Sequence, residues 1–411
     1  MSVDMPKESN AQKGENELSE KIVKASIRIY LDKVRGQGSL YAPVGSIPKD
    51  VRRILITRED PRFFRHKGIL PDAMLHAVLY GLRTHTPMPG GSTITQQLIK
   101  NLYLNEERSV RRKTAEIVLA LQVEMTPLLS KKEILELYFN CVRYGPDVYG
   151  IADAADYYFG KKPEKLTRNQ AVILSTIAIS PFWRRPIETP TYFTIYRNQS
   201  LSELVAFGAL TEKEARLIAD TYDPEQGLDP ELKSLSGIYG VNEGPKTSDG
   251  LVDYARDMVG APYWKGGYGQ RASLGLLNHR RWEHPDDFTG MDFLDDLGKR
   301  VFDDAGLIKG YLWSGTKAAR PYRDRKQDWN NAMLYKMSKN KGRVDSFDHL
   351  NGRLLYKGRS PENISHVGIY SSDGFVYHAK NRACGVVAEA FRPQDWAFWS
   401  DVPEYERNTY F

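Results

Sequence analysis

The sequence predicts a multidomain protein with a mainly α-helical N-terminal domain followed by an α+β C-terminal domain. Its 411 residues exceed the length of one ordinary domain. Between residues 20 and 222 apolar residues recur at three- and four-residue spacing, which indicates helices that share a core. After residue 251 short strand-like segments separated by turn residues appear among helical ones, which indicates a mixed domain.

Changes in composition set the predicted boundaries. Residues 1–18 are polar and poor in apolar side chains, so we expect a disordered tail. Residues 19–222 form the predicted helical domain. Residues 223–250 are rich in Pro, Gly, Ser and Asp and have weak periodicity, which predicts an interdomain linker. Residues 251–411 form the predicted second domain.

Four segments of the first domain have the clearest helical pattern, namely 110–129, 131–140, 168–179 and 211–221. Thr211 opens the last of them as an expected N-cap, with acids in the first turn. In the second domain the expected strands are 366–370, 374–378 and 385–389, bounded by turn residues at 371–374 and 381–382.

Composition excludes several classes of protein. Two cysteines, Cys141 and Cys384, exclude a disulfide scaffold and a cysteine-rich zinc module. The longest apolar stretch, 171–180, is about half the length that a membrane span needs, and the polar start lacks the apolar region of a signal peptide. A net charge of +6 suits an anionic membrane or a phosphate-bearing substrate, and it is no nucleic-acid signature.

Residues 58–68, REDPRFFRHKG, place two acids, three arginines, a histidine and two phenylalanines in eleven positions. On composition alone, the segment is equally well interpreted as a solvated loop anchored by the phenylalanines or as part of a functional site. Residues 90–101, GGSTITQQLIKN, have Thr93 and Gln96 at capping-box spacing, which predicts a helix start. Such a start, with Lys100 following, suits a phosphate group, although for this segment in isolation an ordinary capped helix is the favoured interpretation.

Two further segments are informative only together with the first two. Arg112 and Glu116 are four residues apart and share a helix face, which in isolation predicts a surface ion pair. Residues 132–140 have the apolar spacing of a core-facing helix, so a structural role is favoured there.

In this order and spacing, the four segments resemble the family 51 glycosyltransferases, the peptidoglycan polymerases of class A penicillin-binding proteins and their monofunctional forms. The family patterns are Glu-Asp-x-x-Phe-x-x-His-x-Gly, Gly-Gly-Ser-Thr-Ile-Thr-Gln-Gln, Arg-Lys-x-x-Glu and Ile-Leu-Glu-x-Tyr-x-Asn. The matching segments here are 59–68, 90–97, 112–116 and 134–140, with further likeness at 149–161 and 166–181. The resemblance covers about residues 35–200.

This resemblance implies a lysozyme-like fold, a lipid II substrate and an inverting transfer. The donor sugar of the growing glycan carries a lipid pyrophosphate, which the 4-hydroxyl of the acceptor displaces. Such a reaction needs a base at the hydroxyl and positive charge at the pyrophosphate. Glu59 is the implied base and Glu116 the second acid. The implied substrate-binding residues are Asp60, Phe63, His66, Ser92, Thr93, Gln96, Gln97, Lys100, Arg112, Lys113, Glu136 and Asn140.

The resemblance also bears on cofactors, partners and location. A divalent cation such as Mg²⁺ suits phosphate chemistry, although no metal-ligating residues are predicted. Residues 69–82 correspond to the family's membrane-dipping segment, and a core helix explains them equally well. Family members usually carry a membrane anchor, and we find neither anchor nor signal. We therefore expect the protein to act at the cell envelope, at the outer face of the cytoplasmic membrane. We also expect an anchoring, secretion or immunity partner, or else that the protein is a secreted effector or a phage protein.

Residues 251–411 resemble the NlpC-type papain-like cysteine peptidases, which cut peptidoglycan stem peptides. The resemblance rests on segments 252–264, 306–311, 366–370, 385–387 and 396–399. It implies a papain-like fold that contacts stem peptides.

The nucleophile of that family is missing. Asp304 stands where the family has its cysteine, His366 matches the base and His378 the orienting residue, so we expect a degenerate peptidase site. Cys384 is a less favoured nucleophile because it lies on the strand side and not at a helix start. A carboxylate-based route, with Asp303 also holding a water or metal, is a further alternative.

Three functions follow in order of preference. The first is a peptidoglycan glycosyltransferase with an appended domain that binds stem peptides. The second is a hydrolase or toxin that acts on peptidoglycan or lipid II. The third is a non-catalytic scaffold bound to the cell wall, which the intact Glu59 and Glu116 disfavour.

Overall fold

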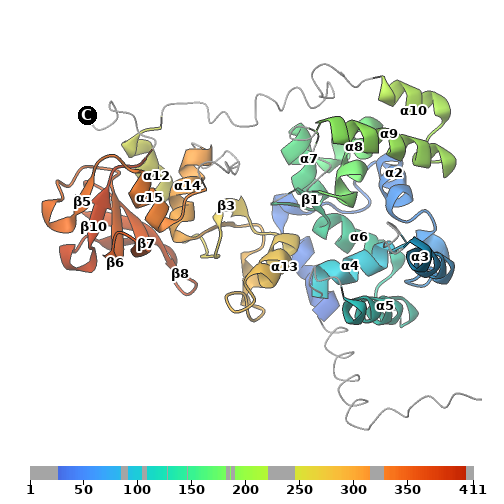
Figure 1. The fold of residues 1–411 in the computed structure, drawn as a ribbon, viewed down its shortest axis with the longest axis horizontal. Helices are drawn as coiled ribbons and strands as arrows, with labels where there is room; N and C mark the ends of the chain where they lie inside the picture. Colours follow the sequence, from blue (N-terminus) through green and yellow to red (C-terminus); the bar gives the residue numbers. More distant parts are fainter. Residues whose placement is uncertain are drawn as a thin grey trace, which may run out of the picture. The chain divides into compact units, whose positions relative to one another are not determined.

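The computed structural model describes residues 26–84, 91–103, 109–126, 128–145, 147–181, 186, 190–220, 246–314 and 328–403 (Figure 1). The predicted tail and residues 223–245 of the predicted linker lie outside these ranges. The chain divides into two compact units. The first combines Met1–Leu235 with Ser273–Leu297, and the second combines Ser236–Ala272 with Gly298–Phe411.

The first unit is helical, as the sequence predicts. Residues 26–35 form its first described helix. The other elements are η1 (Gly38–Leu40), α2 (Lys49–Glu59), η2 (Phe63–Arg65), α3 (Pro71–Thr84), α4 (Ile94–Tyr103), α5 (Val110–Met125), α6 (Lys131–Cys141), β1 (Arg143–Gly145), β2 (Val148–Tyr149), α7 (Ile151–Phe159), η3 (Pro163–Lys165), α8 (Arg168–Ile179), α9 (Pro190–Ala206), α10 (Glu212–Ala219), α13 (Leu274–Glu283) and η4 (Asp292–Asp296).

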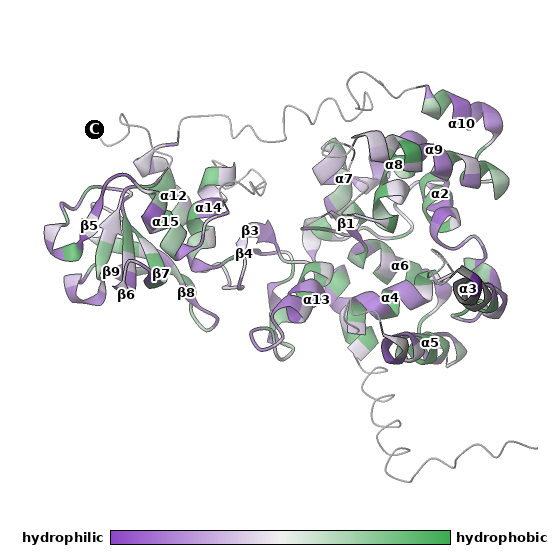
Figure 2. Cartoon of the chain, in the orientation of Figure 1, coloured by the Kyte–Doolittle hydropathy of each residue, from purple (hydrophilic) through white to green (hydrophobic). Residues whose placement is uncertain are grey.

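Helix α8 packs against α2, α9 and β1. Every residue from 170 to 177 is buried, and Figure 2 shows the hydrophobic character of this helix. Most of these side chains are hydrophobic, as expected of a helix that its neighbours enclose, and the buried polar ones are Gln170, Ser175 and Thr176. Cys141, at the end of α6, is also buried, and burial raises the pKa of its thiol.

Capping side chains fix where several helices begin. Thr211 accepts a hydrogen bond from the Glu214 N–H, which confirms the predicted N-cap. Helix α5 ends at Met125, earlier than the predicted 129. Thr126 adopts an extended conformation because Pro127 follows it, and a residue before proline avoids the helical region.

The second unit is α+β. Its elements are α12 (Ser248–Asp257), β3 (Tyr268–Arg271), β4 (Arg300–Phe302), α14 (Asp304–Ser314), α15 (Asn331–Met337), β5 (Lys341–Arg343), η5 (Val344–Ser346), β6 (Leu354–Ser360), β7 (Asn363–Tyr370), β8 (Phe375–Asn381), β9 (Gly385–Ala390), η6 (Pro393–Asp395) and β10 (Phe398–Ser400). The predicted strands 366–370 and 385–389 are confirmed within β7 and β9, and the predicted strand 374–378 is confirmed except that β8 begins one residue later, after the turn at Gly374.

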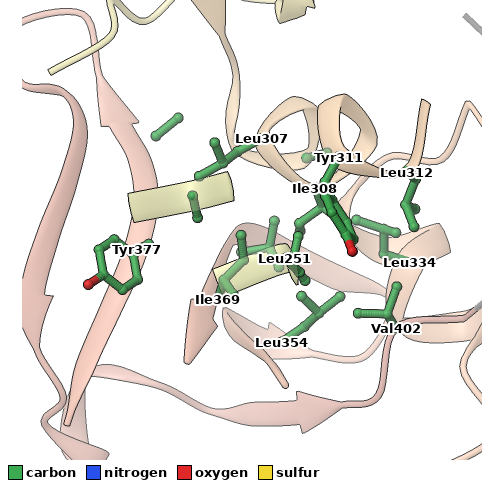
Figure 3. Packing of buried hydrophobic residues seen from close by; sticks show 14 of the residues in the cluster. Leu251, Leu307, Ile308, Tyr311, Leu312, Leu334, Leu354, Ile369, Tyr377 and Val402 are labelled. Carbon is green, nitrogen blue, oxygen red and sulfur yellow. The ribbon is translucent and has the colours of Figure 1, made fainter. Parts of the chain in front are cut away.

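A six-stranded antiparallel sheet forms the body of this unit, in the order β5-β10-β6-β7-β8-β9. Helix α14 packs against β7 and β8. Figure 3 shows Leu307, Ile308 and Tyr311 of this helix in one cluster with Leu251 and strand residue Ile369. This packing places the start of α14 beside the sheet, where the degenerate site was predicted.

Two boundaries differ from the sequence prediction. Thr247 caps α12, so a helix starts inside the predicted linker 223–250. Residues Ser273–Leu297 cluster with the first unit, although the prediction placed all of 251–411 in one domain. The physical reason is that α13 buries Leu274, Leu276 and Leu277 and contacts α4, α6 and β2.

In the described part of the chain, no helix combines the length and hydropathy needed to cross a bilayer.

Candidate functional site

Glu59 ends helix α2, and its side chain is half-buried. The Gln97 side-chain amide donates a hydrogen bond to Glu59 Oε2 at 2.8 Å, and Glu59 Oε1 is buried without a hydrogen-bond partner. Burial raises the pKa of Glu59, and the amide of Gln97 with the charges of Arg58 and Lys100 only partly offsets it. A carboxylate with a raised pKa accepts a proton more readily, as a general base must.

Asp60 and His66 brace the loop that follows Glu59. The His66 Nδ1 atom accepts the Gly68 N–H at 3.1 Å, so a neutral ring carries its hydrogen on Nε2 and donates it to Asp60 Oδ2 at 2.8 Å. The same Asp60 oxygen accepts the Ile94 N–H at 3.1 Å. Gly68 has a φ of +89°, and a Cβ there would lie 2.5 Å from the Ala120 carbonyl oxygen, so only glycine fits. The loop is thereby fixed to the start of α4.

The predicted capping box at the start of α4 is confirmed. Thr93 Oγ1 accepts the Gln96 N–H at 3.1 Å, and the Gln96 side chain accepts the Thr93 N–H at 2.9 Å. Thr93 Oγ1 also donates to the Gly68 carbonyl at 2.6 Å, and both side chains are buried. Their hydrogen bonds therefore position the helix.

Glu116 is buried, which excludes the simple surface pair that the sequence also allowed. Arg112 Nη1 donates to its Oε2 at 2.8 Å, and the Lys113 ammonium pairs with its Oε1. Lys113 also donates to Ser92 Oγ at 2.8 Å. The predicted residues Ser92, Arg112, Lys113 and Glu116 are thus brought into one network.

A cavity of about 660 Å³ opens in front of Glu59. It is lined by Thr57, Glu59, Asp60, Pro61, Arg62, Arg65, Leu70, Asp72, Ala73, Gly91, Ser92 and Phe207. Sequence reasoning did not single out Arg62 and Arg65, although the three arginines of residues 58–68 were a signal. Arg62 pairs with Asp72 at 2.6 Å, whereas Arg65 has no ion pair with any residue that the structure describes. Positive charge therefore lies beside the buried carboxylate.

Four predicted substrate residues lie elsewhere. Asn140 exchanges hydrogen bonds with the backbone of Ala42, at 2.8 and 2.9 Å. Burial alone would raise the pKa of Glu136, but hydrogen bonds from Arg35 and Tyr41 outweigh it and hold the pKa below its ordinary value. These side chains fasten the segment before α2 onto α6. Phe63 is buried beneath the ammonium of Lys131, and Lys100 lines a different, smaller cavity.

The predicted residues of the second unit form one hydrogen-bonded chain. Asp304, at the start of α14, lies 3.2 Å from His366 Nδ1 and accepts the Asn331 amide at 2.6 Å. His366 Nε2 lies 2.7 Å from His378 Nδ1, and His378 Nε2 lies 3.0 Å from Glu389. The structure therefore brings position 304 and both histidines together.

Burial shifts the pKa of two groups at this site, His378 and Asp303. It lowers the pKa of His378 to about 4, helped by neighbouring His366, while the Glu389 carboxylate acts in the opposite direction. Burial also raises the pKa of Asp303 to about 6, against the charge of Lys309. Asp303 accepts the N–H groups of Gly266 at 2.9 Å and Gly306 at 2.5 Å, so it fixes the turn into α14.

The sequence left two other hypotheses open for the second unit: Cys384 as the nucleophile, and a carboxylate site that holds a water or metal. Cys384 is exposed in the turn between β8 and β9, and its N–H donates to the Asn381 side chain at 3.0 Å. It is therefore not at a helix start. In the described ranges, no group of three or more His, Cys, Asp or Glu side chains is arranged to hold a metal ion.

Comparison with known proteins supports the resemblance of the N-terminal region. Residues 28–205 match the family model described as Transglycosylase. The chain is 36% identical over 178 residues to penicillin-binding protein 1A of Aquifex aeolicus, a match that covers 43% of this chain and 24% of that protein. It is also 36% identical over 168 residues to penicillin-binding protein 1A of Escherichia coli, covering 41% and 20%. The chain thus spans a quarter or less of the length of these curated relatives.

Among solved structures, the chain matches the crystal structure of the NlpC/p60 domain of peptidoglycan hydrolase SagA. The identity is 19% and the TM-score 0.24, over 38% of this chain and 100% of that one.

Proposed function

We propose that the first unit is a peptidoglycan glycosyltransferase that polymerises lipid II into glycan strands. Glu59 is the base and Glu116 the second acid. The observation that carries this proposal is a buried carboxylate with a raised pKa, bordered by arginines, on a cavity in the region that matches the transglycosylase family. The site of action that fits is the outer face of the cytoplasmic membrane.

In the proposed reaction, the 4-hydroxyl of the acceptor sugar attacks the anomeric carbon of the lipid-linked donor. Glu59 takes the hydroxyl proton, a glycosidic bond forms, and the bond between the anomeric carbon and the pyrophosphate breaks. Positive charge around the cavity stabilises the negative charge of the leaving group. Glu116 holds Arg112 and Lys113 in place, and Lys113 in turn positions Ser92 on the cavity wall.

The proposed role of the second unit is to bind peptidoglycan stem peptides without cysteine-peptidase chemistry. Asp304 occupies the start of α14, and a carboxylate is a poor nucleophile for acyl transfer. A purified chain that cleaves muropeptides, and stops doing so on His366→Ala, would contradict this role.

The decisive experiment is polymerisation of labelled lipid II by the full chain and by Glu59→Gln. We expect glycan ladders from the wild type and a loss of turnover of at least about 100-fold in the variant, because the base is removed. The pyrophosphate offers oxygen ligands to a divalent cation, so the assay is run with Mg²⁺ and with a chelator.

The matched control is Glu212→Gln, which neutralises a surface acid whose side chain is 77% exposed in the same unit. Its activity should equal that of the wild type. Near-normal turnover of Glu59→Gln would exclude Glu59 as the base. Consumption of lipid II or finished peptidoglycan without polymer would instead favour a hydrolase or toxin.

A further inference from the structure

The hydrogen-bonded chain of the second unit has a carboxylate at each end and two imidazole rings between them. Asp304 lies 3.2 Å from His366 Nδ1, and His366 Nε2 lies 2.7 Å from His378 Nδ1. His378 Nε2 lies 3.0 Å from Glu389. Both nitrogens of both rings are therefore engaged, and each of these three contacts needs a hydrogen atom to be attractive.

Two neutral histidines cannot supply hydrogens to all of these contacts. An ionised carboxylate only accepts hydrogen bonds, whereas a neutral imidazole donates from one nitrogen and accepts at the other. Two neutral rings thus bring one hydrogen too few. Whichever tautomers they adopt, one contact would set two lone pairs against each other and leave polar groups unsatisfied, which is costly away from water. The chain is complete only with one additional proton.

The Glu389 end of the chain does not hold this proton. Lys380 donates to Glu389 at 2.6 Å, and this hydrogen bond is the main reason why the pKa of Glu389 lies below its ordinary value. The ionised Glu389 then accepts from His378 Nε2. Burial lowers the pKa of His378 to about 4, and neighbouring His366 adds to the effect, so His378 Nδ1 is left to accept from His366 Nε2. The additional proton therefore belongs between His366 Nδ1 and Asp304.

Asp304 is placed to share that proton. It opens α14, where the N–H groups of the first turn favour a negative charge, and the Asn331 amide donates to it at 2.6 Å. The side chain of Asp304 is 15% exposed and that of His366 is 16% exposed. Charges that are mostly withdrawn from water attract each other more strongly than exposed ones, so a carboxylate here favours a positive His366.

Other charged groups act on His366 in both directions. Lys357 of β6 is the register partner of His366, with its ammonium over the Trp396 ring, and it disfavours a positive histidine. Asp303 acts in the opposite direction once it ionises, and burial raises its pKa to about 6. Helices α12, α14 and α15 also pack against β7, and their remaining charged side chains are Asp249, Asp253, Arg256, Asp257, Lys309 and Lys336.

We infer that the chain holds one proton beyond those of two neutral histidines, and that this proton lies between Asp304 and His366. It joins the start of α14 to β7. When the proton leaves at higher pH, the contact loses its hydrogen and should open, whereas His366 stays bonded to His378. The second unit thus contains a pH-sensitive connection between helix and sheet. This connection needs neither glycosyltransferase activity nor the binding of stem peptides.

Two isosteric variants test the proton count. In Asp304→Asn the new amide can donate to His366 Nδ1, so both histidines can be neutral with their hydrogens on Nε2. In Glu389→Gln the new amide can donate to His378 Nε2, so both can be neutral with their hydrogens on Nδ1. Each variant satisfies every contact without the additional proton, and the two do so from opposite ends. Either one alone keeps the test valid if the other fails to fold.

The measurement is nitrogen-15 NMR of the histidine side chains in the full chain across pH, which distinguishes both tautomers from the doubly protonated ring. The second hydrogen of His366 should leave at a pH lower by about one unit or more in each variant than in the wild type. Above that pH, the two variants should show opposite tautomers of His366 and His378.

The matched control is Asp345→Asn, which neutralises an acid of the same unit whose side chain is 77% exposed. His366 should titrate in it as in the wild type. If the second hydrogen of His366 leaves at the same pH in the wild type and in both variants, the chain holds no additional proton and the inference is overturned. Identical tautomers in the two variants overturn it equally.

Discussion

The two acids of the first unit differ in the number and charge of their partners. Glu59 accepts one neutral amide hydrogen bond and leaves an oxygen buried without a partner. Glu116 contacts two cations. A poorly solvated carboxylate is suited to exchanging a proton, whereas a doubly paired one is suited to fixing the position of its partners.

The amide of Gln97 tunes Glu59, which leads to a pH prediction. Its hydrogen bond favours the carboxylate and lowers the pKa of Glu59. Gln97→Leu removes it, so the pKa rises further and the base becomes protonated at a higher pH. The acid limb of kcat/KM should therefore move to higher pH, as measured by the rate of lipid II polymerisation across pH.

The control for this shift is Asn340→Leu. Asn340 donates a comparable hydrogen bond to Asp401 at 3.0 Å, but on the exposed surface of the second unit. Its pH profile should match that of the wild type. An acid limb that stays in place in Gln97→Leu would show that Glu59 is not the titrating base.

Position 304 retains the surroundings that activate a thiol, since it opens α14 beside His366. In Asp304→Cys, the helix start and the histidine should favour the thiolate. We expect the new thiol to react with iodoacetamide at pH 7 about ten-fold faster than the exposed Cys384, which serves as internal control. Mass spectrometry of the two peptides gives both rates. Equal rates would mean that the site no longer activates a nucleophile.

At the residue scale, the sequence predicted what lies in a continuous motif. Arg112 pairs with Glu116 on one helix face, as their spacing predicts, and the motif residues Glu59 and Gln97 are hydrogen-bonded to each other. Asn140 matches the motif equally well, yet its hydrogen bonds go to the backbone of Ala42. A motif preserves residues that hold the fold and residues that face the cavity alike, and one sequence cannot separate them.

At the scale of helices and strands, local sequence signals predicted where an element begins or ends, but not which elements it packs against. Capping boxes at Thr93 and Thr211 begin helices as predicted, because their hydrogen bonds involve only residues three apart. The end of α5 before Pro127 has a local cause as well. No local signal identifies the elements that α13 packs against. Its apolar pattern predicts that one face is buried but not which element covers that face.

For the whole molecule, sequence patterns therefore do not predict which unit each segment packs in. The chain enters the second unit, returns for Ser273–Leu297 to the first, and enters the second again. A boundary drawn at the predicted linker therefore removes α13 from the unit against whose helices α4 and α6 it packs. Residues distant in sequence form one packed unit here, and composition along the chain does not record such a crossing.

Because Ser273–Leu297 belong to the first unit, a substitution that weakens the packing of α13 should destabilise that unit. Leu276 is 1% exposed, so Leu276→Ala should cost about 2–5 kcal/mol through lost burial and a cavity. Calorimetry of the full chain identifies the affected transition by reference to two fully buried residues, using Leu174→Ala in α8 for the first unit and Ile308→Ala in α14 for the second. Leu276→Ala should lower the transition that Leu174→Ala lowers. If it lowers the one that Ile308→Ala lowers, α13 folds with the second unit, and its packing against α4 and α6 does not stabilise the first.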